Sequence, residues 1–288
     1  MFNWGTKTYV MGILNVTPDS FSGDGVLPRD DVLATAVAQA QQFAADGADI
    51  IDIGGESTRP GSTPVTEAEE LARVIPVIEA VRTAVSLPIS VDTYRANVAE
   101  AALAAGANWI NDVWGFRMDP RIAHVAAQAN CPVVLMHNRS KPKDVAQEER
   151  LGGRYVGVAY DDLIADIKRE LGESIELARQ AGVKEEHIIL DPGVGFGKTV
   201  TQNLQIVNQL DQFKTMGYPI LLGTSRKSFI GYTLDLPPED RLEGTAATVA
   251  IGIARGADIV RVHDVKAMAR VAKMTDALAR VQIISDQS

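Results

Sequence analysis

Eight short, largely apolar runs recur along the 288-residue chain, and longer stretches with helical spacing separate them. The last stretch shows this spacing best, with Val265, Met268, Val271, Met274, Leu278 and Val281 three or four residues apart. Nearly continuous apolar runs are typical of parallel strands whose sheet is covered on both faces. Eight strand–helix units in this length predict an α/β protein, a (β/α)8 TIM barrel. We expect a single domain over 1–288, with a core from about 8 to 280 and strands at 8–14, 49–54, 88–92, 108–113, 132–137, 187–191, 219–223 and 258–262.

Four of the expected strands carry a polar residue within or at the end of an apolar run. Asp52, Asn111 and Arg261 each follow a helix-ending glycine by five residues, and Asp191 ends its strand. These are the second, fourth, eighth and sixth strands, and alternate strands of a barrel contribute side chains to the same layer. We therefore expect the four side chains to form one polar layer at the carboxyl-terminal mouth.

Polar residues also crowd the loops that follow the strands, in NVTPDSFSGDG (15–25), GGESTRPGSTPV (54–65), SVDT (90–93), TSRKSFIG (224–231) and RVHDV (261–265). Such loops build the active site of a (β/α)8 barrel. A buried carboxylate is costly unless it is paired, so acids such as Asp92 and Asp191 inside apolar runs indicate function.

The segment DPGVGFGKT (191–199) has the glycines of a phosphate-binding loop but not their spacing. A P-loop has four residues between its first glycine and the glycine before its lysine, whereas Gly193 and Gly197 enclose three. Pro192, at the position where the first glycine would stand, has no amide hydrogen to offer. We interpret the segment as a tight strand-to-helix turn headed by Asp191, with Lys198 as a helix-start or surface residue.

The net charge of −9 and the pI near 5.0 argue against nucleic acid and membrane surfaces as partners. An anionic substrate would need a local cluster of cations, for which the candidates are Arg59, Lys227, Arg261 and His263. The last three follow the seventh and eighth strands, where such barrels usually bind phosphate. The second set of candidates, Asp92, Asn111 and Asp191, offers acceptors for a flat heterocycle with several N–H donors.

Three further segments support smaller expectations. The single cysteine, Cys131, opens the run CPVVLM and is expected to be a buried structural thiol. The first residues lack a basic region and a long apolar core, so a cytoplasmic protein is expected. The polar segment 138–159 is too long for a short connection, and we expect a mobile excursion above the mouth, with a solvated surface insertion as the alternative.

Nine motifs in series make the sequence resemble the bacterial dihydropteroate synthases from about residue 8 to about 280. They are MGILNVTPDSFS, DIGGESTRPG, SVDT, INDV, LMH, DPGVGFGK, TSRKSFIG, EGTAAT and RVHDV. The resemblance implies a (β/α)8 barrel, usually a homodimer, that uses Mg²⁺. It implies the condensation of (7,8-dihydropterin-6-yl)methyl diphosphate with 4-aminobenzoate, giving 7,8-dihydropteroate and diphosphate. One departure is Gly23-Asp24-Gly25 after SFS, where the family often has an acid directly after the serine, so the role of Asp24 stays open.

The resemblance also implies a role for each site residue. The pterin is expected on Asp92, Asn111, Met136, Asp191, Phe196 and Lys227. The diphosphate is expected near Asn15, Thr58, Arg261 and His263, with Asn15 also facing the metal. The aminobenzoate is expected on Phe21, Arg59, Pro60 and Ser228. The catalytic residues are expected to be Asp92, Lys227, Arg261 and His263.

This chemistry needs no enzyme nucleophile, because the diphosphate leaves the pterin methylene carbon and the amine attacks it. Asp92 is the candidate that stabilises the cationic ring, and we expect departure to run ahead of attack. Oxygen ligands suit Mg²⁺, and His263 suits a phosphate donor better than a lone metal ligand.

Two other interpretations share the pterin pocket. A methyltetrahydrofolate corrinoid methyltransferase-type pterin domain would have no use for Lys227, Arg261 and His263 as a diphosphate set. A non-catalytic pterin-binding paralogue would be expected to lose loop residues first, yet Asn15 and Arg59 are present.

Overall fold

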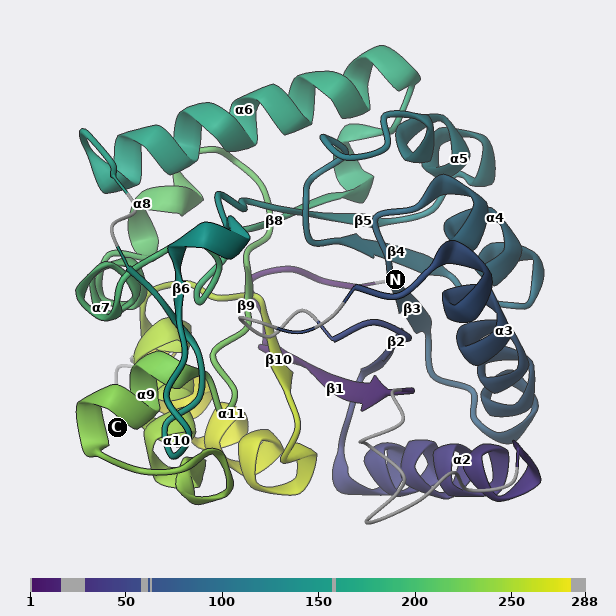
Figure 1. Cartoon of the computed structure of the whole chain (residues 1–288), viewed down its shortest axis with the longest axis horizontal. Helices are drawn as coiled ribbons and strands as arrows, with labels where there is room; N and C mark the ends of the chain where they lie inside the picture. Colours follow the sequence, from purple (N-terminus) through teal and green to yellow (C-terminus); the bar gives the residue numbers. More distant parts are fainter. Residues whose placement is uncertain (1, 17–28, 58–61, 63, 157–158, 281–288) are drawn as a thin grey trace, which may run out of the picture.

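The computed structural model describes residues 2–16, 29–57, 62, 64–156 and 159–280. Eight parallel strands form its centre, and helices surround them (Figure 1). Each strand lies within two residues of its predicted range at either end. The strands are β1 (Tyr9–Asn15), β2 (Ile50–Gly54), β3 (Ile89–Asp92), β4 (Trp109–Asp112), β5 (Val133–Met136), β8 (Ile188–Asp191), β9 (Leu221–Leu222) and β10 (Ile259–Val262).

The strands pair side by side in the order β8-β5-β4-β3-β2-β1-β10-β9, and every pairing is parallel. A parallel bridge between Leu190 and Ile220 joins the two ends of this order, and the amide of Leu190 donates to the carbonyl of Pro219 at 2.9 Å. The bridge closes the sheet on itself, which confirms the predicted (β/α)8 barrel.

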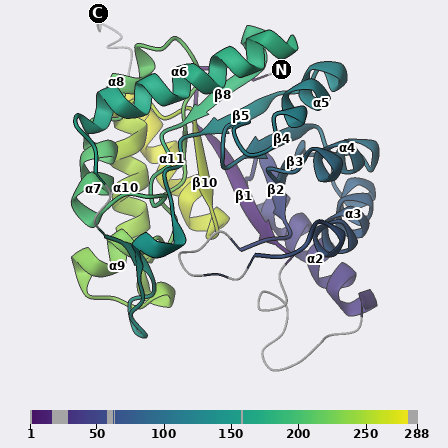
Figure 2. The ribbon, with the colours of Figure 1, turned by 45° about the horizontal axis from the view of Figure 1, so that its top comes forward.

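Helices follow the strands and cover their outer faces (Figure 2). They are α2 (Arg29–Asp46), α3 (Glu67–Ala84), α4 (Ala96–Ala104), α5 (Arg121–Ala129), α6 (Leu163–Ala181), α7 (Val200–Asn208), α8 (Asp211–Lys214), α9 (Ser228–Leu234), α10 (Leu242–Ala254) and α11 (Val265–Ala279). Local signals fix several ends: Thr66 and Glu69 form a capping box at α3, and Gly182 ends α6 in the left-handed conformation. None of the described helices is long and apolar enough to span a bilayer.

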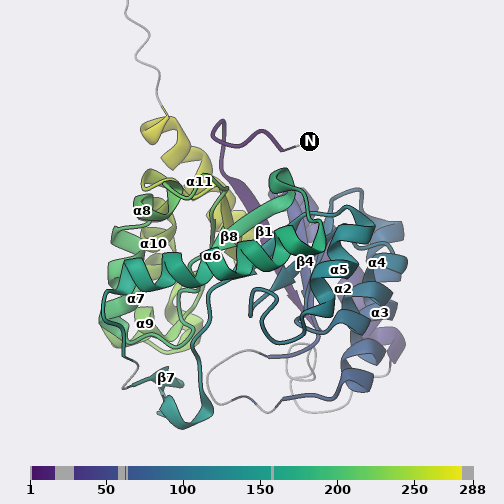
Figure 3. The ribbon, with the colours of Figure 1, turned by 90° about the horizontal axis from the view of Figure 1, so that it is seen from above.

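The barrel interior is apolar toward the amino ends of the strands. Tyr9, Met11, Ile50, Trp109, Val134, Ile189, Leu221 and Ile259 form this inner cluster. Phe2 and Trp4 pack against it, with the rings of Phe2 and Trp109 5.0 Å apart. The N-terminal segment thus lies at one end of the barrel, opposite the end where β7 lies (Figure 3). The apolar plug leaves the carboxyl ends of the strands for polar chemistry.

The segment 138–159 holds more structure than the sequence predicts. It contains a 3-10 turn, η1 (Pro142–Asp144), and an antiparallel hairpin of β6 (Val145–Ala146) and β7 (Arg154–Tyr155). The hairpin loop docks on the α9 region, because Tyr232 Oη donates to the carbonyl of Gly152 at 3.1 Å and Arg241 donates to that of Leu151 at 2.9 Å. Two hydrogen bonds therefore attach the described part of the segment to the α9 region, and its mobility stays a prediction.

Two predictions about single elements have different outcomes. Cys131 is buried, and burial raises the pKa of its thiol to about 11, which confirms a structural thiol. In α11, Val265 and Met268 are buried as predicted, whereas Met274 and Leu278 are 59% and 69% exposed. Ala272 and Thr275 complete the buried face instead.

Candidate active site

Arg261, on β10, joins the polar side chains of the barrel mouth. Its Nε donates to Oδ2 of Asp52 and its Nη2 to Oδ2 of Asp92, each at 2.6 Å. The same Asp52 oxygen accepts a hydrogen bond from Nδ2 of Asn111 at 3.1 Å. Asp52, Asn111 and Arg261 therefore share one layer, as the alternation of strands predicts. Arg261, however, pairs with the acids and does not stand apart in a cationic set.

Asp92 has an unusually high pKa for a carboxyl group. Burial raises the pKa of Asp92 to about 7, although Arg261 opposes the rise and Asp52 adds to it. Burial works against the charge of Arg261, but Asp52 and Asp92 outweigh it and raise the pKa of the guanidinium. Asp92 thus changes charge near neutral pH, a property that favours a functional carboxyl over a structural one.

Asp191 ends β8 beside the glycine turn. Its Oδ1 accepts the amide of Gly193 at 2.7 Å, and burial raises the pKa of its carboxyl while Lys227 opposes the rise. Its strand register places it opposite Met136 at the end of β5. Asp191 interacts electrostatically with Arg261, so the fourth member of the predicted layer also belongs to this site.

Lys227 lies between the turn and the barrel. Its Nζ donates to the carbonyl of Val194 and lies 4.7 Å from the centre of the Phe196 ring. Burial lowers the pKa of Lys227 to about 8, against the attraction of Asp191. The structure thus brings together Asp191, Phe196 and Lys227, three of the predicted pterin residues.

Ser225, which is not among the residues predicted from the sequence, positions His263. Its Oγ lies 2.9 Å from Nδ1 of His263 and accepts the His263 amide at 3.1 Å. Arg226 and Asp264 form an ion pair beside it. These contacts join the loop after β9, which carries Lys227, to the loop after β10, which carries His263.

Other predicted residues lie at the rim. Asn15 ends β1, is half-buried and pairs in register with Gly54, which in turn pairs with Asp92. Ser228 is the first residue of α9, directly after Lys227. The candidates that lie outside the described residues are Phe21, Asp24, Thr58, Arg59 and Pro60.

The structure contradicts the prediction that Lys198 is a surface residue. It is only 2% exposed, not a surface residue. Its Nζ donates to the carbonyls of Gly193 and Phe196, and it lies 2.9 Å from Nδ1 of His137. The available signal was the capping box of Thr199 and its partner three residues later, which starts α7 one residue after Thr199 and leaves the lysine in the turn.

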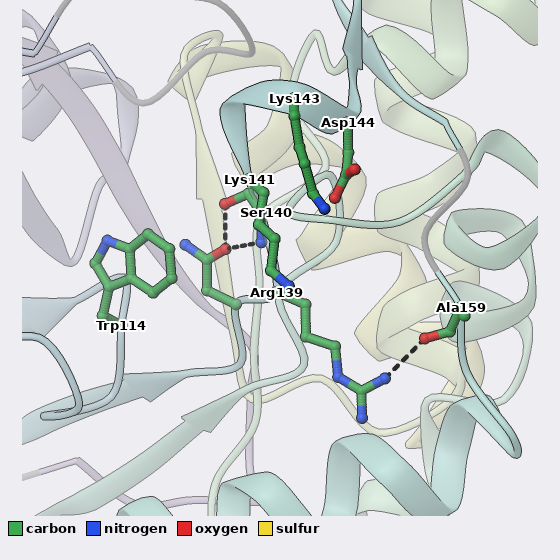
Figure 4. A pocket seen from close by; sticks show the side chains of 8 residues that line it. Trp114, Arg139, Ser140, Lys141, Lys143, Asp144 and Ala159 are labelled. Carbon is green, nitrogen blue, oxygen red and sulfur yellow. Dashed lines mark hydrogen bonds between the residues drawn. The ribbon is translucent and has the colours of Figure 1, made fainter.

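A cavity of about 560 Å³ lies next to the loop after β5 (Figure 4). Its lining residues are Trp114, Asn138, Arg139, Ser140, Lys141, Lys143, Asp144 and Ala159. Figure 4 shows the Arg139 guanidinium directed at the Ala159 carbonyl, to which it donates at 2.9 Å. None of the predicted site residues that the structure describes lines this cavity.

Comparison with known proteins gives the same result at the level of family, sequence and structure. Residues 11–263 match the family model described as "Pterin binding enzyme". The dihydropteroate synthase of Bacillus subtilis is 55% identical over 94% of this chain and 89% of its own length. That of Clostridium beijerinckii is 53% identical over 97% of both chains.

Solved structures agree with these relatives. A Clostridium difficile dihydropteroate synthase, crystallised in the presence of pteroic acid, superposes with a TM-score of 0.88 and is 49% identical, covering 98% of this chain and 100% of that one. The Xanthomonas albilineans dihydropteroate synthase with 4-aminobenzoic acid gives a TM-score of 0.85 at 42% identity, covering 96% and 94%. With the barrel and its acid–arginine mouth in place, these matches show that the chain belongs to the dihydropteroate synthase family of pterin binding enzymes.

Proposed function

We propose that this chain condenses (7,8-dihydropterin-6-yl)methyl diphosphate with 4-aminobenzoate, giving 7,8-dihydropteroate and diphosphate, and that it does so at the Arg261 centre. One observation carries the placement: the acids Asp52 and Asp92 share Arg261 at the mouth of the barrel. This arrangement puts acceptors for a heterocycle beside a cation for a diphosphate.

The pterin ring suits the acidic side of the mouth. Its guanidine-like edge presents parallel N–H groups, which a carboxylate accepts in pairs. Asp92 and Asp191 supply such carboxylates, and Asn111 supplies an amide. Oδ1 of Asp52, buried and without a partner in the described part of the chain, adds an acceptor nearby. Phe196 and Met136 provide apolar walls, and Lys227 stands over the Phe196 face.

The diphosphate suits the cationic side. Arg261, Lys227 and His263 supply positive charge or N–H donors, and Ser225 fixes the His263 ring. Asn15 and Thr58 complete the proposed diphosphate set. These groups stabilise the charge that the leaving diphosphate takes with it, which is the stabilisation that such a displacement most needs.

The displacement then needs no covalent enzyme intermediate. The bond between the methylene carbon and the diphosphate oxygen breaks, and its electron pair leaves with the diphosphate. The electron-rich ring shares the positive charge, which the Asp92 carboxylate stabilises. The amine nitrogen of 4-aminobenzoate attacks the methylene carbon and loses a proton to water. Ser228, beside Lys227, and the residues Phe21, Arg59 and Pro60 are proposed to hold the aminobenzoate in line for this attack.

Magnesium fits the donors of this site. No group of three His, Cys, Asp or Glu residues in the described ranges could hold a metal by itself. Mg²⁺ typically keeps waters and binds through few protein oxygens plus substrate phosphates. The amide oxygen of Asn15 would hold it, and the ion would supply charge neutralisation at the diphosphate.

We also propose a homodimer that works in the cytoplasm without nucleic acid or membrane partners. Exposed apolar side chains, Ile251 on α10 and Met274 and Leu278 on α11, lie on two helices that pack together, which supports a protein interface there. A multiply charged substrate does not cross a bilayer, so the enzyme must meet it where it is made. The net charge of −9 opposes binding to nucleic acid.

Diphosphate release with and without 4-aminobenzoate tests the reaction. We expect release that depends on the amine and on Mg²⁺. Pterin binding without release would instead support the non-catalytic paralogue. Methyl transfer from methyltetrahydrofolate to a corrinoid, with no diphosphate release, would support the methyltransferase-type domain.

A further inference from the structure

The Lys198 side chain is buried behind the turn formed by residues 193–197, and burial lowers the pKa of its amine well below the ordinary value. Its Nζ donates to the carbonyls of Gly193 at 2.8 Å and Phe196 at 3.0 Å, and it lies 2.9 Å from Nδ1 of His137. Lys198 thereby connects Gly193, at the start of the turn, to Phe196, the aromatic residue of the turn.

Side chains hold the other polar groups of the turn as well. Lys227 donates to the carbonyl of Val194, and Tyr160 Oη donates to that of Gly197 at 3.1 Å. The amide of Gly195 donates to Oδ1 of Asn203 at 2.7 Å. Two lysines therefore hold neighbouring carbonyls, Lys227 from the side of the barrel mouth and Lys198 from the side of His137.

Two glycines of the turn pack closely against the segment that follows β5. Gly193 has a φ of 72°, and a Cβ there would overlap the carbonyl oxygen of His137. Gly197 has a φ of 61°, and a Cβ there would lie 2.5 Å from the carbonyl carbon of Arg139. Both glycines let the turn press against residues 137–140. Its position is thus set by the segment that follows β5.

His137 passes the constraint to α6. Its Nε2 lies 3.0 Å from Oε2 of Glu170, whose other oxygen accepts Nε of Arg139 at 2.9 Å. Burial and the neighbouring Lys198 lower the pKa of His137 to about 3, so the neutral ring accepts at Nδ1 and donates at Nε2. Lys198, His137 and Glu170 therefore form a buried chain from the turn to a long helix.

We propose that Lys198 is a positioning residue, which holds the 193–197 turn so that Phe196 and Lys227 stand where the pterin binds. The proposal rests on the function proposed above. Lys198 acts only through the turn. Removing it takes the side-chain donor from the Phe196 carbonyl and leaves the Gly193 carbonyl with the Phe196 amide alone, at 3.1 Å, so the turn relaxes and the Phe196 wall moves. Aminobenzoate, held elsewhere in the mouth, should hardly sense the change.

The test compares Lys198→Met with Lys214→Met. Lys214 is the matched control because its Nζ also serves a buried acceptor, Oδ2 of Asp258 at 2.6 Å, away from the turn. We expect Lys198→Met to raise KM for the pterin diphosphate about tenfold, leaving KM for 4-aminobenzoate within about twofold, as for loss of one or two buried hydrogen bonds on one substrate. Lys214→Met should change neither KM.

Amide hydrogen exchange gives a readout independent of turnover. In Lys198→Met the amides of Gly193 and Gly195 should exchange faster, whereas in Lys214→Met they should not. An unchanged pterin KM, with unchanged exchange in the turn and a loss of stability like that of the control, would overturn the proposal. If the parent protein releases no diphosphate, the proposed function fails, and pterin affinity and exchange still decide the role of Lys198.

Tyr160→Phe serves if Lys198→Met does not fold. This variant removes only the hydrogen bond to the Gly197 carbonyl and keeps the ring that packs against Arg139, whose guanidinium carbon lies 4.2 Å from the ring centre. We expect a rise of about twofold to fivefold in the pterin KM, a smaller effect because one hydrogen bond is lost. An unchanged pterin KM here would count against control of the site by the turn.

Discussion

Asp92→Asn should make the protein more stable while nearly abolishing its activity. Its effect on stability follows from the pKa of about 7 for a carboxyl whose ordinary value is 3.8. Folded Asp92 holds its proton more tightly than unfolded Asp92, so ionisation costs stability as pH rises from about 4 to about 7, and the full penalty applies above pH 7. At 1.36 kcal/mol per pH unit, the penalty is about 4 kcal/mol. Asparagine, which cannot ionise, avoids it.

The activity of Asp92→Asn should fall although its stability rises. The amide that replaces the carboxylate offers one acceptor oxygen instead of two, and its NH₂ opposes an N–H of the pterin. Losing hydrogen bonds to a charged group, at about 1.5–3 kcal/mol each, should lower kcat/KM for the pterin diphosphate about 100- to 1,000-fold. Inorganic diphosphate should inhibit the variant as strongly as the parent protein or more strongly, because Arg261 loses one of the two carboxylates that compete for it.

Urea unfolding at pH 8 and pH 5, with steady-state diphosphate release, measures both effects. The variant should be the more stable protein at pH 8, and its advantage should shrink at pH 5. Lower stability at pH 8, or equal losses in turnover and in diphosphate inhibition, would refute the assignment of a charged, ring-facing Asp92.

Three further outcomes are expected. The kcat/KM for the pterin diphosphate should depend on pH as a bell-shaped curve, which rises as Asp92 loses its proton near pH 7 and falls as Lys227 loses its own near pH 8. Asp92→Asn should remove the rise on the acid side, and an unchanged rise in this variant would contradict the prediction. Trp109→Ala should cost about 3–5 kcal/mol in urea unfolding yet leave kcat/KM of the folded protein unchanged, because the ring plugs the opposite end of the barrel. Arg241→Ala removes three hydrogen bonds to carbonyls and should lower the free energy of unfolding by about 3 kcal/mol or more. Arg150→Ala removes an exposed ion pair and should lower it by less than about 1 kcal/mol. Similar melting temperatures of the two variants would rule this out.

The barrel could be predicted because its signals are local and repeated. Apolar runs mark strands, and side-chain alternation alone places Asp52, Asn111 and Arg261 on one inner face. Predictions are weaker where partners lie far apart in sequence. Glu170 reaches His137 across 33 positions, and nothing local in either segment marks the pairing. Lys198 is polar and would be expected at the surface, but carbonyls of the turn accept hydrogen bonds from its buried Nζ.

The contacts between segment 138–159 and the α9 region could not be predicted from the sequence either. Segment 138–159 is rich in charge, which is typical of an exposed loop. Part of its attachment to the α9 region comes from main-chain carbonyls of Leu151 and Gly152, and carbonyls have no sequence signature. The ion pairs of Arg261 were also missed, because residue type predicts a charge but not the partner that shares it.

A crystal structure with the pterin diphosphate bound tests the central placement most directly. We predict the ring within hydrogen-bonding distance of Asp92 and Asp191, beside Phe196, with the diphosphate at Arg261 and His263. A pterin ring bound in the cavity lined by Trp114 and Lys141, or a diphosphate on that side, would contradict it.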